Sequence, residues 1–245
     1  MASTAGLFEE APVAIDSPET QPLLGRSSEV IQQEKPVLLN LVTGTASIAQ
    51  LGIWIFAILI WFKILSQPII LFTAHPLLAI SGLLLQIQGI LILQPTTTAS
   101  EKRKGTRFHY IIQLLSALLF LSAFIVIEVN KGTHPHFDSA HGVLGLLTII
   151  FIVSQSLVGV VQYFLPRSLL GSVENGKRLY KYHRWSGYVA LLVLEIPTAI
   201  WGATQTGYSI ASLHIPLWAV VLPGLAVVLG VGARVKTYKL GLGND

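Results

Sequence analysis

The sequence has no cysteine among its 245 residues, and this absence removes several kinds of redox site. Without thiols the chain forms no disulfide, no iron–sulfur cluster, no zinc–thiolate site and no covalently attached c-type haem. Charge is also scarce, because Asp, Glu, Lys and Arg make up 11% of the residues, against about 25% in an ordinary soluble domain. Since hydrophobic residues make up 52%, the composition predicts an integral membrane protein.

Motifs for soluble redox chemistry are missing as well. The chain shows no phosphate-binding loop, no dinucleotide fingerprint and no flavin domain, so a protein that draws electrons directly from NADPH is not expected. The formal net charge is +4, but the basic residues stand in short segments between apolar stretches rather than in one stripe. Nucleic acid is therefore not expected as a partner, and the basic segments are typical of residues that flank a membrane.

Six apolar stretches each approach or exceed the ~20 residues with which a helix crosses a ~30 Å hydrocarbon layer. They cover residues 37–62, 69–94, 108–127, 141–164, 183–203 and 215–233. The stretches are continuous rather than alternating, which favours helices over a β-barrel. The prediction is an all-α membrane protein with six transmembrane helices in a lipid bilayer. We expect a flexible tail at 1–36, a transmembrane domain at 37–235 and a short tail at 236–245.

The connections between the predicted helices differ in their content of lysine and arginine. The second and fourth connections and the C-terminal tail are basic, whereas the first has only Lys63, the third only Lys131 and the fifth none. Because basic residues stay on the cytosolic side, both termini are expected in the cytosol. The segment 19–24 (ETQPLL) also resembles an acidic dileucine signal for vacuolar or lysosomal delivery. Vacuolar, endosomal and plasma membranes all stay open as the resident membrane.

Four of the seven histidines stand at or just inside the start of a predicted transmembrane helix. Consecutive helices run in opposite directions, so these starts alternate between the two faces of the membrane. His75 and His141 therefore fall near the non-cytosolic face, and His109 and His183 near the cytosolic face. Strongly polar side chains at membrane depth are costly and usually face a partner inside the bundle. The sequence thus predicts one histidine pair near each surface.

Two facing imidazoles suit the axial positions of a six-coordinate haem iron, whereas zinc usually takes three or four protein ligands. Small residues follow three of the histidines on roughly the same helix face: Gly82, Gly89, Gly145 and Gly187. They would let a flat porphyrin approach the backbone, but glycine also serves helix packing in membranes. The alternative is a haem-free multi-pass transporter or structural membrane protein, whose histidines relay protons or satisfy the bundle.

Four motifs around these histidines resemble the cytochrome b561 family: AHPLL at 74–78, KRKGTRFH at 102–109, SAHG at 139–142 and LYKYH at 179–183. The resemblance covers roughly residues 40–235 and is greatest to the stand-alone subgroup with one six-helix unit. It implies two non-covalent b-type haems in a central four-helix bundle formed by spans 2–5. His75 and His141 would hold one haem, and His109 and His183 the other, with no ligand from the first and sixth spans.

The family also implies an activity, which is the transfer of electrons across the membrane. Ascorbate or a related reductant would give an electron on the cytosolic side, and monodehydroascorbate or a ferric chelate would accept it on the other. Because ascorbate is a monoanion, basic residues beside the cytosolic histidines are candidate contacts: Arg107, Lys102, Lys104 and Lys181. On the far side, His134 and His136 are candidate contacts for the acceptor. Dimers occur in the family, so a homodimer is a further option.

One acidic residue falls inside a predicted span. Glu195 precedes Pro197 in the fifth apolar stretch, where a carboxyl group would lie well inside the hydrocarbon layer. Two interpretations are open for it. The side chain is either a protonated carboxyl that is hydrogen-bonded to a neighbouring helix, or a group that moves a proton coupled to haem reduction.

Overall fold

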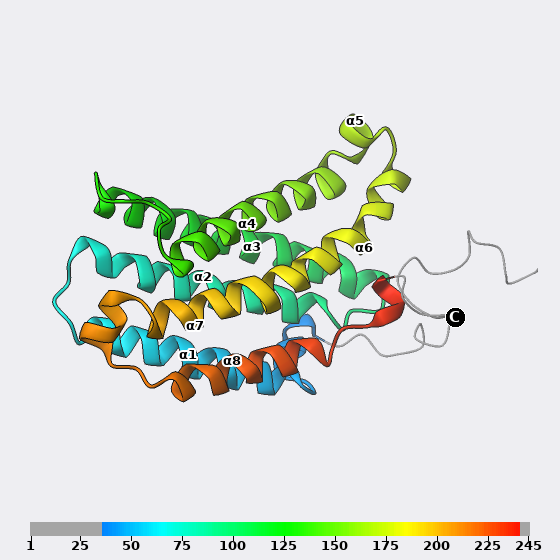
Figure 1. Cartoon of the computed structure of the whole chain (residues 1–245). Helices are drawn as coiled ribbons and strands as arrows, with labels where there is room; N and C mark the ends of the chain where they lie inside the picture. The colour runs from blue at the N-terminus through cyan, green and yellow to red at the C-terminus, as the bar shows by residue number, and fades with distance from the viewer. Residues whose placement is uncertain (1–35, 241–245) are drawn as a thin grey trace, which may run out of the picture.

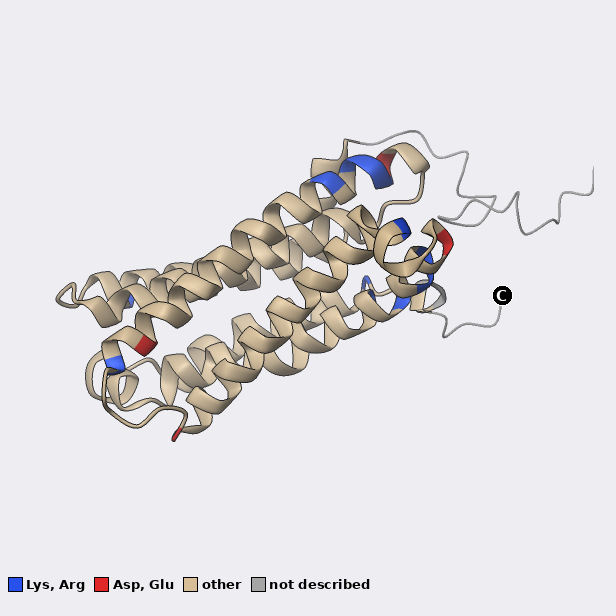
Figure 2. Cartoon of the chain, turned by 90° about the horizontal axis from the view of Figure 1, so that it is seen from above, with Lys and Arg blue, Asp and Glu red and all other residues tan. Residues whose placement is uncertain are grey.

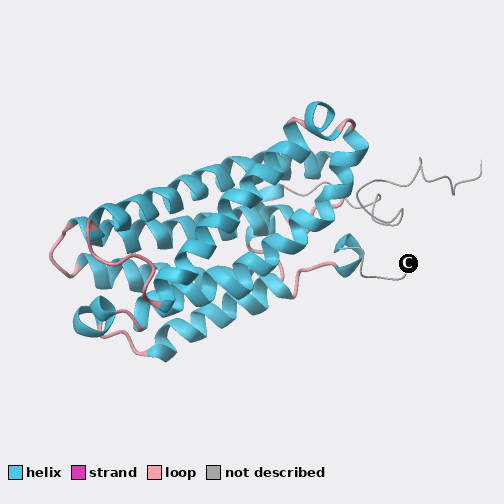
Figure 3. Cartoon of the chain, turned by 45° about the horizontal axis from the view of Figure 1, so that its top comes forward, coloured by secondary structure: helices cyan, strands magenta, loops and turns pink. Residues whose placement is uncertain are grey.

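The computed structural model describes residues 36–240, and helices make up most of this part of the chain (Figure 3). No strand occurs between residues 36 and 240, which confirms the predicted all-α class for the described residues. The predicted tail at 1–36, with the dileucine-like segment 19–24, lies outside the described residues except for Pro36. The tail at 236–245 is described only as far as residue 240.

The long helices run back and forth along one direction and are joined by short connections (Figure 1). In chain order they are α1 (Ala46–Leu65), α2 (Leu71–Leu93), α3 (Ala99–Lys131), α4 (Ala140–Phe164), α6 (Val173–Val189), α7 (Ile196–Thr204) and α8 (Leu217–Gly232). The short segments are η2 (Val37–Leu41), α5 (Pro166–Leu170), the π-helical η3 (Ala190–Glu195) and η4 (Ser209–Leu213), and η5 (Thr237–Leu240). The segments α6, η3 and α7 continue one another from Val173 to Thr204.

Within residues 36–240, five helices are long and apolar enough to cross a membrane: α1, α2, α3, α4 and the continuous helix Val173–Thr204. The sixth predicted stretch forms α8, an apolar helix of 16 residues, which is shorter than the ~20 residues of a full crossing. The chain is therefore an integral membrane protein of several helices, and a sixth crossing stays a prediction.

The first apolar stretch does not form one helix from residue 37, so that predicted boundary is wrong. The short η2 comes first, and a turn at Gly44 separates it from α1, which begins at Ala46. Gly44 has a φ of +59°, a backbone conformation that glycine adopts without steric cost. The turn therefore shortens the first helix to a length that still fits the bilayer.

The start of α3 also differs from the prediction. The helix begins at Ala99 rather than near residue 108, because Thr98 and Glu101 form a capping box. Thr98 Oγ1 accepts a hydrogen bond from the backbone N–H of Glu101 (3.2 Å), and Glu101 Oε2 accepts one from the N–H of Thr98 (3.4 Å). The basic segment 102–107, predicted as part of a loop, therefore forms the first turns of α3 and has a fixed relation to the helix that follows.

The helices α1 and α8 lie side by side along one edge of the bundle, away from α4 (Figure 1). Glycine permits their close approach, because a Cβ on Gly230 would lie 2.5 Å from the backbone nitrogen of Ala49. A Cβ on Gly52 would lie equally close, at 2.5 Å, to the carbonyl oxygen of Pro223. Small residues of this kind are common where membrane helices pack backbone to backbone. This pair leaves α2, α3, α4 and α6–α7 to form the remainder of the bundle.

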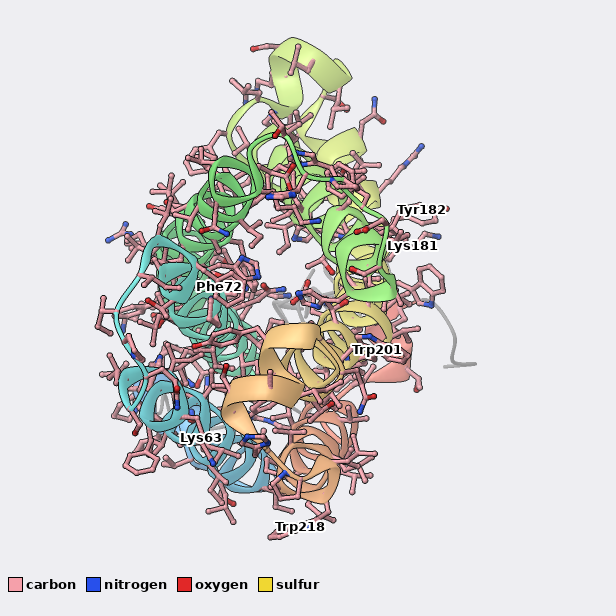
Figure 4. All side chains as sticks on the ribbon, turned by 60° about the vertical axis from the view of Figure 1, so that its left-hand side comes forward. Lys63, Phe72, Lys181, Tyr182, Trp201 and Trp218 are labelled. Atoms are coloured by element: carbon pink, nitrogen blue, oxygen red, sulfur yellow. The ribbon has the colours of Figure 1, made fainter. Side chains whose placement is uncertain are left out.

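Large apolar side chains cover the outside of the bundle. Figure 4 looks along the helices and shows Trp201 and Trp218 on the outer side, where they are 44% and 67% exposed. Many exposed leucines, isoleucines and valines accompany them on α1, α3, α4 and α8. An apolar surface of this extent would associate in water but is satisfied by lipid chains.

Replacing Gly230 with Val is expected to push α1 away from α8, since the added atoms would overlap the backbone of Ala49. We expect a loss of about 1–3 kcal/mol in stability, measured as a lower apparent Tm of the detergent-solubilised protein. Gly232→Ala is the matched control, because a Cβ there meets nothing within 4 Å. Equal Tm values for Gly230→Val and the wild type would contradict the close packing of these two helices.

Candidate functional site

The four histidines that were predicted to pair lie in two pairs in the structure. The ring centres of His75 on α2 and His141 on α4 are 6.1 Å apart, with an interplanar angle of 80°. The ring centres of His109 on α3 and His183 on α6 are 6.5 Å apart, with an interplanar angle of 86°. His75 is near the start of α2, whereas His109 contacts the carbonyl group of Gly89 near the end of α2, so the two pairs lie toward opposite ends of the bundle.

Backbone carbonyl groups on neighbouring helices hold three of the four rings. The Nδ1 atoms of His75, His109 and His141 lie 2.9, 2.8 and 3.2 Å from the carbonyl oxygens of Ala123, Gly89 and Thr198, respectively. A carbonyl oxygen only accepts, so Nδ1 carries the proton in these rings and Nε2 keeps its free electron pair. Metal-ligating histidines are usually oriented in this way, with the second ring nitrogen donating to a carbonyl or carboxylate.

A side chain, rather than a carbonyl group, contacts the fourth ring. Nδ1 of His183 lies 2.8 Å from the terminal amide of Gln155 on α4. The same amide contacts the hydroxyl group of Ser186, which lies nearly one turn after His183 on α6. Gln155 therefore bridges α4 and α6 and fixes the ring of His183 from the side.

The spacing within each pair fits one metal atom between two imidazoles. With metal–nitrogen distances of about 2 Å, and ring centres about 1.1 Å behind the nitrogens, two axial imidazoles have ring centres roughly 6.2 Å apart. The observed distances are 6.1 and 6.5 Å. Between residues 36 and 240, no three His, Asp or Glu side chains gather where they could hold a bare metal ion. Each pair therefore suits a group that brings further ligands of its own, as a porphyrin does.

Two glycines that sequence reasoning missed lie against the paired rings. A Cβ on Gly202 of α7 would lie 2.6 Å from Cε1 of His141, and a Cβ on Gly159 of α4 would lie 3.4 Å from Cε1 of His183. Each glycine stands on the helix that faces the ring, far from its histidine in the sequence. Spacing along one helix could not reveal them, because the contact joins two helices.

Two of the glycines that sequence reasoning did select lie against a neighbouring helix. A Cβ on Gly82 would lie 3.0 Å from the ring of Phe120, and a Cβ on Gly89 would lie 3.0 Å from the side chain of Gln113, both on α3. These two glycines therefore serve the close packing of α2 against α3. A Cβ on Gly145 would meet nothing within 4 Å, and one on Gly187 only the side-chain oxygen of Gln155, at 3.9 Å.

Basic residues gather at one end of the bundle, where α5 lies (Figure 2). Lys104, Arg107 and Lys181 are exposed there, and Lys102 is half-buried. Because an α-helix turns about 100° per residue, Lys102 shares a face of α3 with His109, whereas Arg107 is on the opposite face. The structure therefore aligns Lys102, more than Arg107, with the pair of His109 and His183. An anion at this end would be attracted by the whole group of charges.

A comparison with protein families shows the family to which the chain belongs. The model of the eukaryotic cytochrome b561 family matches residues 74–209, which is more than half of the chain. The chain belongs to the cytochrome b561 family. The matched region starts just before His75 and contains all four paired histidines. A comparison with curated proteins gave no match.

Membership of the cytochrome b561 family confirms the resemblance seen in the sequence motifs. It implies a transmembrane oxidoreductase that binds haem b and transfers electrons through it. The bundle of apolar helices fits this class, because the helices are long enough to place polar groups near both membrane surfaces. The haem-free transporter is therefore not the function that family membership implies.

The connection between α3 and α4 holds the two histidines predicted as acceptor contacts, His134 and His136. His134 is exposed. His136 is also exposed, but Nε2 lies 3.0 Å from the carbonyl oxygen of Gly132 and Nδ1 contacts the carboxylate of Glu128. The hydrogen bond to Gly132 and the bond to Glu128 raise the pKa of His136 above its ordinary value. The loop is thus tied to the end of α3 through a histidine that is protonated more readily than usual.

Replacing Glu128 with Gln is expected to lower the pKa of His136, because the amide removes the negative charge that favours the imidazolium. In the wild type, the ionic contact between His136 and Glu128 is fully formed below the ordinary histidine pKa of about 6.5. It is lost as the pH rises through the raised pKa of His136. The measurement is an NMR titration of ¹³C-labelled histidine, with His136→Gln for assignment.

Asp138→Asn is the matched control for this titration, because the carboxylate of Asp138 lies 3.7 Å from Lys131 Nζ and has no bond to the imidazole. We expect this variant to leave the pKa of His136 at its wild-type value. An unchanged pKa of His136 in Glu128→Gln would contradict the contact between these two side chains.

Proposed function

We propose that this chain carries electrons from ascorbate, or a related reductant, in the cytosol to monodehydroascorbate or a ferric chelate on the other side of the membrane. Two haem b groups would act as redox centres, one held by His75 and His141 and the other by His109 and His183. The observation that carries the proposal is the spacing of 6.1 and 6.5 Å between the paired ring centres. When bound, haem b supplies reversible one-electron chemistry at its iron.

The helices that carry the paired histidines support a central haem-binding bundle. Each pair takes one histidine from α2 or α3 and the other from α4 or α6, whereas α1 and α8 contain no histidine. The two histidine pairs lie at two levels along the bundle. On α2, His75 marks the first level, and Gly89, whose carbonyl group contacts His109, marks the second. At 1.5 Å per residue these levels are roughly 21 Å apart, so two centres would divide the crossing into shorter steps.

The distribution of charge supports the proposed direction of electron flow. Lysine and arginine cluster at the end of the bundle where His109 and His183 lie (Figure 2). Since basic residues favour the cytosolic side, the chain would place this pair toward the cytosol, with both termini on the same side. The opposite end would face the lumen of a vacuole or endosome, or the outside of the cell.

The same basic residues would attract a reductant that is a monoanion. Lys102, Lys104, Arg107 and Lys181 would raise the local concentration of ascorbate at the cytosolic end, where long-range attraction suffices without a direct contact. Lys102 is the best placed for a direct contact, because it shares the face of α3 that carries His109. Arg107 would contribute mainly through its charge, since its side chain is exposed on the other face.

The acceptor would bind at the other end, beside the connection between α3 and α4. This connection offers His134 and His136, of which His136 also ties the loop to Glu128. An anionic ferric chelate would favour the protonated form of His136, which the same surroundings already favour. The loop would therefore bind such an acceptor better at acidic pH, as in a vacuolar or endosomal lumen.

The purified protein is expected to bind two haem b groups per chain, and His141→Ala and His183→Ala are each expected to bind only one. Removing one axial imidazole leaves an iron with a single protein ligand and removes most of the affinity of that site. The measurement is haem absorbance after extraction into pyridine, divided by protein concentration. His134→Ala is the matched control and should keep both haems.

A colourless, folded wild-type protein would contradict the proposed function and favour the haem-free transporter. Two haems per chain in both of the histidine variants would instead reject the assignment of the ligands. The folded state of each variant is checked by its helical circular dichroism and its elution from a size-exclusion column in detergent.

Removing one positive charge from the cytosolic end is expected to slow reduction by ascorbate. We expect Lys102→Ala and Arg107→Ala to lower the second-order rate constant by roughly threefold to tenfold at low ionic strength, with normal haem content. Lys63→Ala removes the same charge from the opposite end and is the matched control. Stopped-flow spectroscopy of the oxidised protein mixed with ascorbate measures these rates, and wild-type rates in both cytosolic variants would remove their proposed role.

A further inference from the structure

One buried carboxyl group lies between the two histidine pairs and belongs to neither. Glu195 is 3% exposed and is the last residue of the π-helical segment η3. In the chain it lies between His183 and Thr198, whose carbonyl group meets His141. A π-helical turn of this kind rotates the residues on either side of it relative to each other and recurs at functional sites. Glu195 carries the only carboxyl group between Arg184 and the end of the helix at Thr204.

The partner of Glu195 on the opposite side of the bundle is also placed between the pairs. Gln86 Nε2 donates a hydrogen bond to Glu195 Oε1 (2.9 Å). Gln86 lies on α2 between His75 and Gly89, and the carbonyl group of Gly89 meets His109. The contact between Gln86 and Glu195 therefore lies between the two histidine pairs, both along α2 and along the helix from α6 to α7.

The surroundings of Glu195 satisfy neither of its protonation states. Oε2 is buried and has no hydrogen-bond partner among residues 36–240. A protonated carboxyl group would lack an acceptor for its O–H, and a carboxylate would lack both a second donor and a cation. Unsatisfied polar groups of either kind are costly in a bundle that is surrounded by lipid.

In the part of the chain that the structure describes, no lysine or arginine on the segments that pack against Glu195 decides between these two states. The segment η3 packs against α4 and continues α6 and α7. The titratable side chains of α4 are His141 and Tyr163, α2 offers only His75, and α7 has none. The charged residues of α6 end at Arg184, and Tyr188 beyond it bonds to Gln94 rather than to Glu195.

We infer that Glu195 is the proton-binding site linked to electron transfer, an inference that rests on the proposed function. When the redox centres are oxidised, the carboxylate offsets positive charge on their irons. When one electron arrives from the cytosolic reductant, Oε2 binds one proton taken from water, and the group becomes a neutral acid. When the electron leaves to the acceptor, the proton returns to water, so charge and atoms balance over one turnover.

The physical cause is the loss of one positive charge inside a medium of low dielectric constant. At an effective dielectric constant of about 20, the gain or loss of one charge about 10 Å away changes a proton-binding equilibrium roughly tenfold. The two histidine levels flank Glu195 along the helices, so a change of iron charge at either level acts on this carboxyl group more than on exposed groups. Proton binding and electron binding at this depth therefore favour each other.

The first test measures the midpoint potentials of both haems between about pH 5 and pH 9. In the wild type, at least one midpoint is expected to fall as the pH rises, with an upper limit of about 59 mV per tenfold change in proton concentration for a one-electron centre. Glu195→Gln keeps the shape and the contact with Gln86 but binds no proton, so the slope due to this group is lost. Glu195→Asp keeps a carboxyl group and should retain the slope.

Gln50→Leu is the matched control, because Gln50 forms an interhelical amide pair with Gln88 but has no titratable group. This variant should show the wild-type dependence on pH. A wild-type slope in Glu195→Gln, with both haems bound, would overturn the inference while leaving the proposed function intact. A wild-type protein that binds no haem, or that is not reduced by ascorbate, would contradict the proposed function itself.

A second measurement uses only the wild-type protein and does not depend on the variants folding. The infrared difference spectrum between reduced and oxidised protein is expected to show the C=O band of a protonated carboxyl group that appears on reduction. Labelling glutamate with ¹³C should shift this band. A difference spectrum without such a band, or a band unaffected by the label, would overturn the inference.

Discussion

An imidazole inside a bundle surrounded by lipid is stable only if its nitrogens find partners, and this constraint organises the structure. The contacts of Nδ1 join helices in two sets. His75 and His109 bond to carbonyl groups of α3 and α2, respectively, so that these two helices are tied at both ends. His141 bonds to α7 and His183 contacts α4, so that α4 and α6–α7 are tied at both ends as well.

The pair α2–α3 and the pair formed by α4 and α6–α7 face each other through the four histidine rings. His75 meets His141, and His109 meets His183, each across the boundary between the two helix pairs. A group bound between the rings would therefore join the two helix pairs, and its removal would leave them held by fewer contacts. The helices α1 and α8 stand outside this arrangement, and glycine-mediated packing holds them against each other. Haem binding and the stability of the central bundle would be linked for this reason.

The positions of the four histidines could be predicted because they depend on a simple alternation. Each stands near the start of an apolar stretch, and antiparallel helices bring alternate starts of these stretches to the same face. The apolar stretches also predicted the bounds of α2, α4 and α8 to within a few residues. The starts of α1, α3 and α6 differ from the predicted positions 37, 108 and 183, because these helices begin at Ala46, Ala99 and Val173. The turn at Gly44 and the side-chain caps at Thr98 and Ser172, rather than hydropathy, decide where these helices begin.

Apart from the histidine pairs, contacts between helices could not be predicted from one sequence. Gly159 and Gly202 matter because they face rings on other helices, and no pattern along their own helices marks them. The carbonyl partners Ala123 and Thr198 carry no signal at all, since every residue has a carbonyl group. The π-helical segment that ends at Glu195 was equally hidden. Hydropathy and spacing describe single helices, whereas these features depend on how helices pack.

The most direct test of the two-centre arrangement is to locate iron in crystals of the purified protein by anomalous scattering at the iron absorption edge. The arrangement predicts two peaks, one between His75 and His141 and one between His109 and His183. A single peak, or iron bound away from these four side chains, would contradict it.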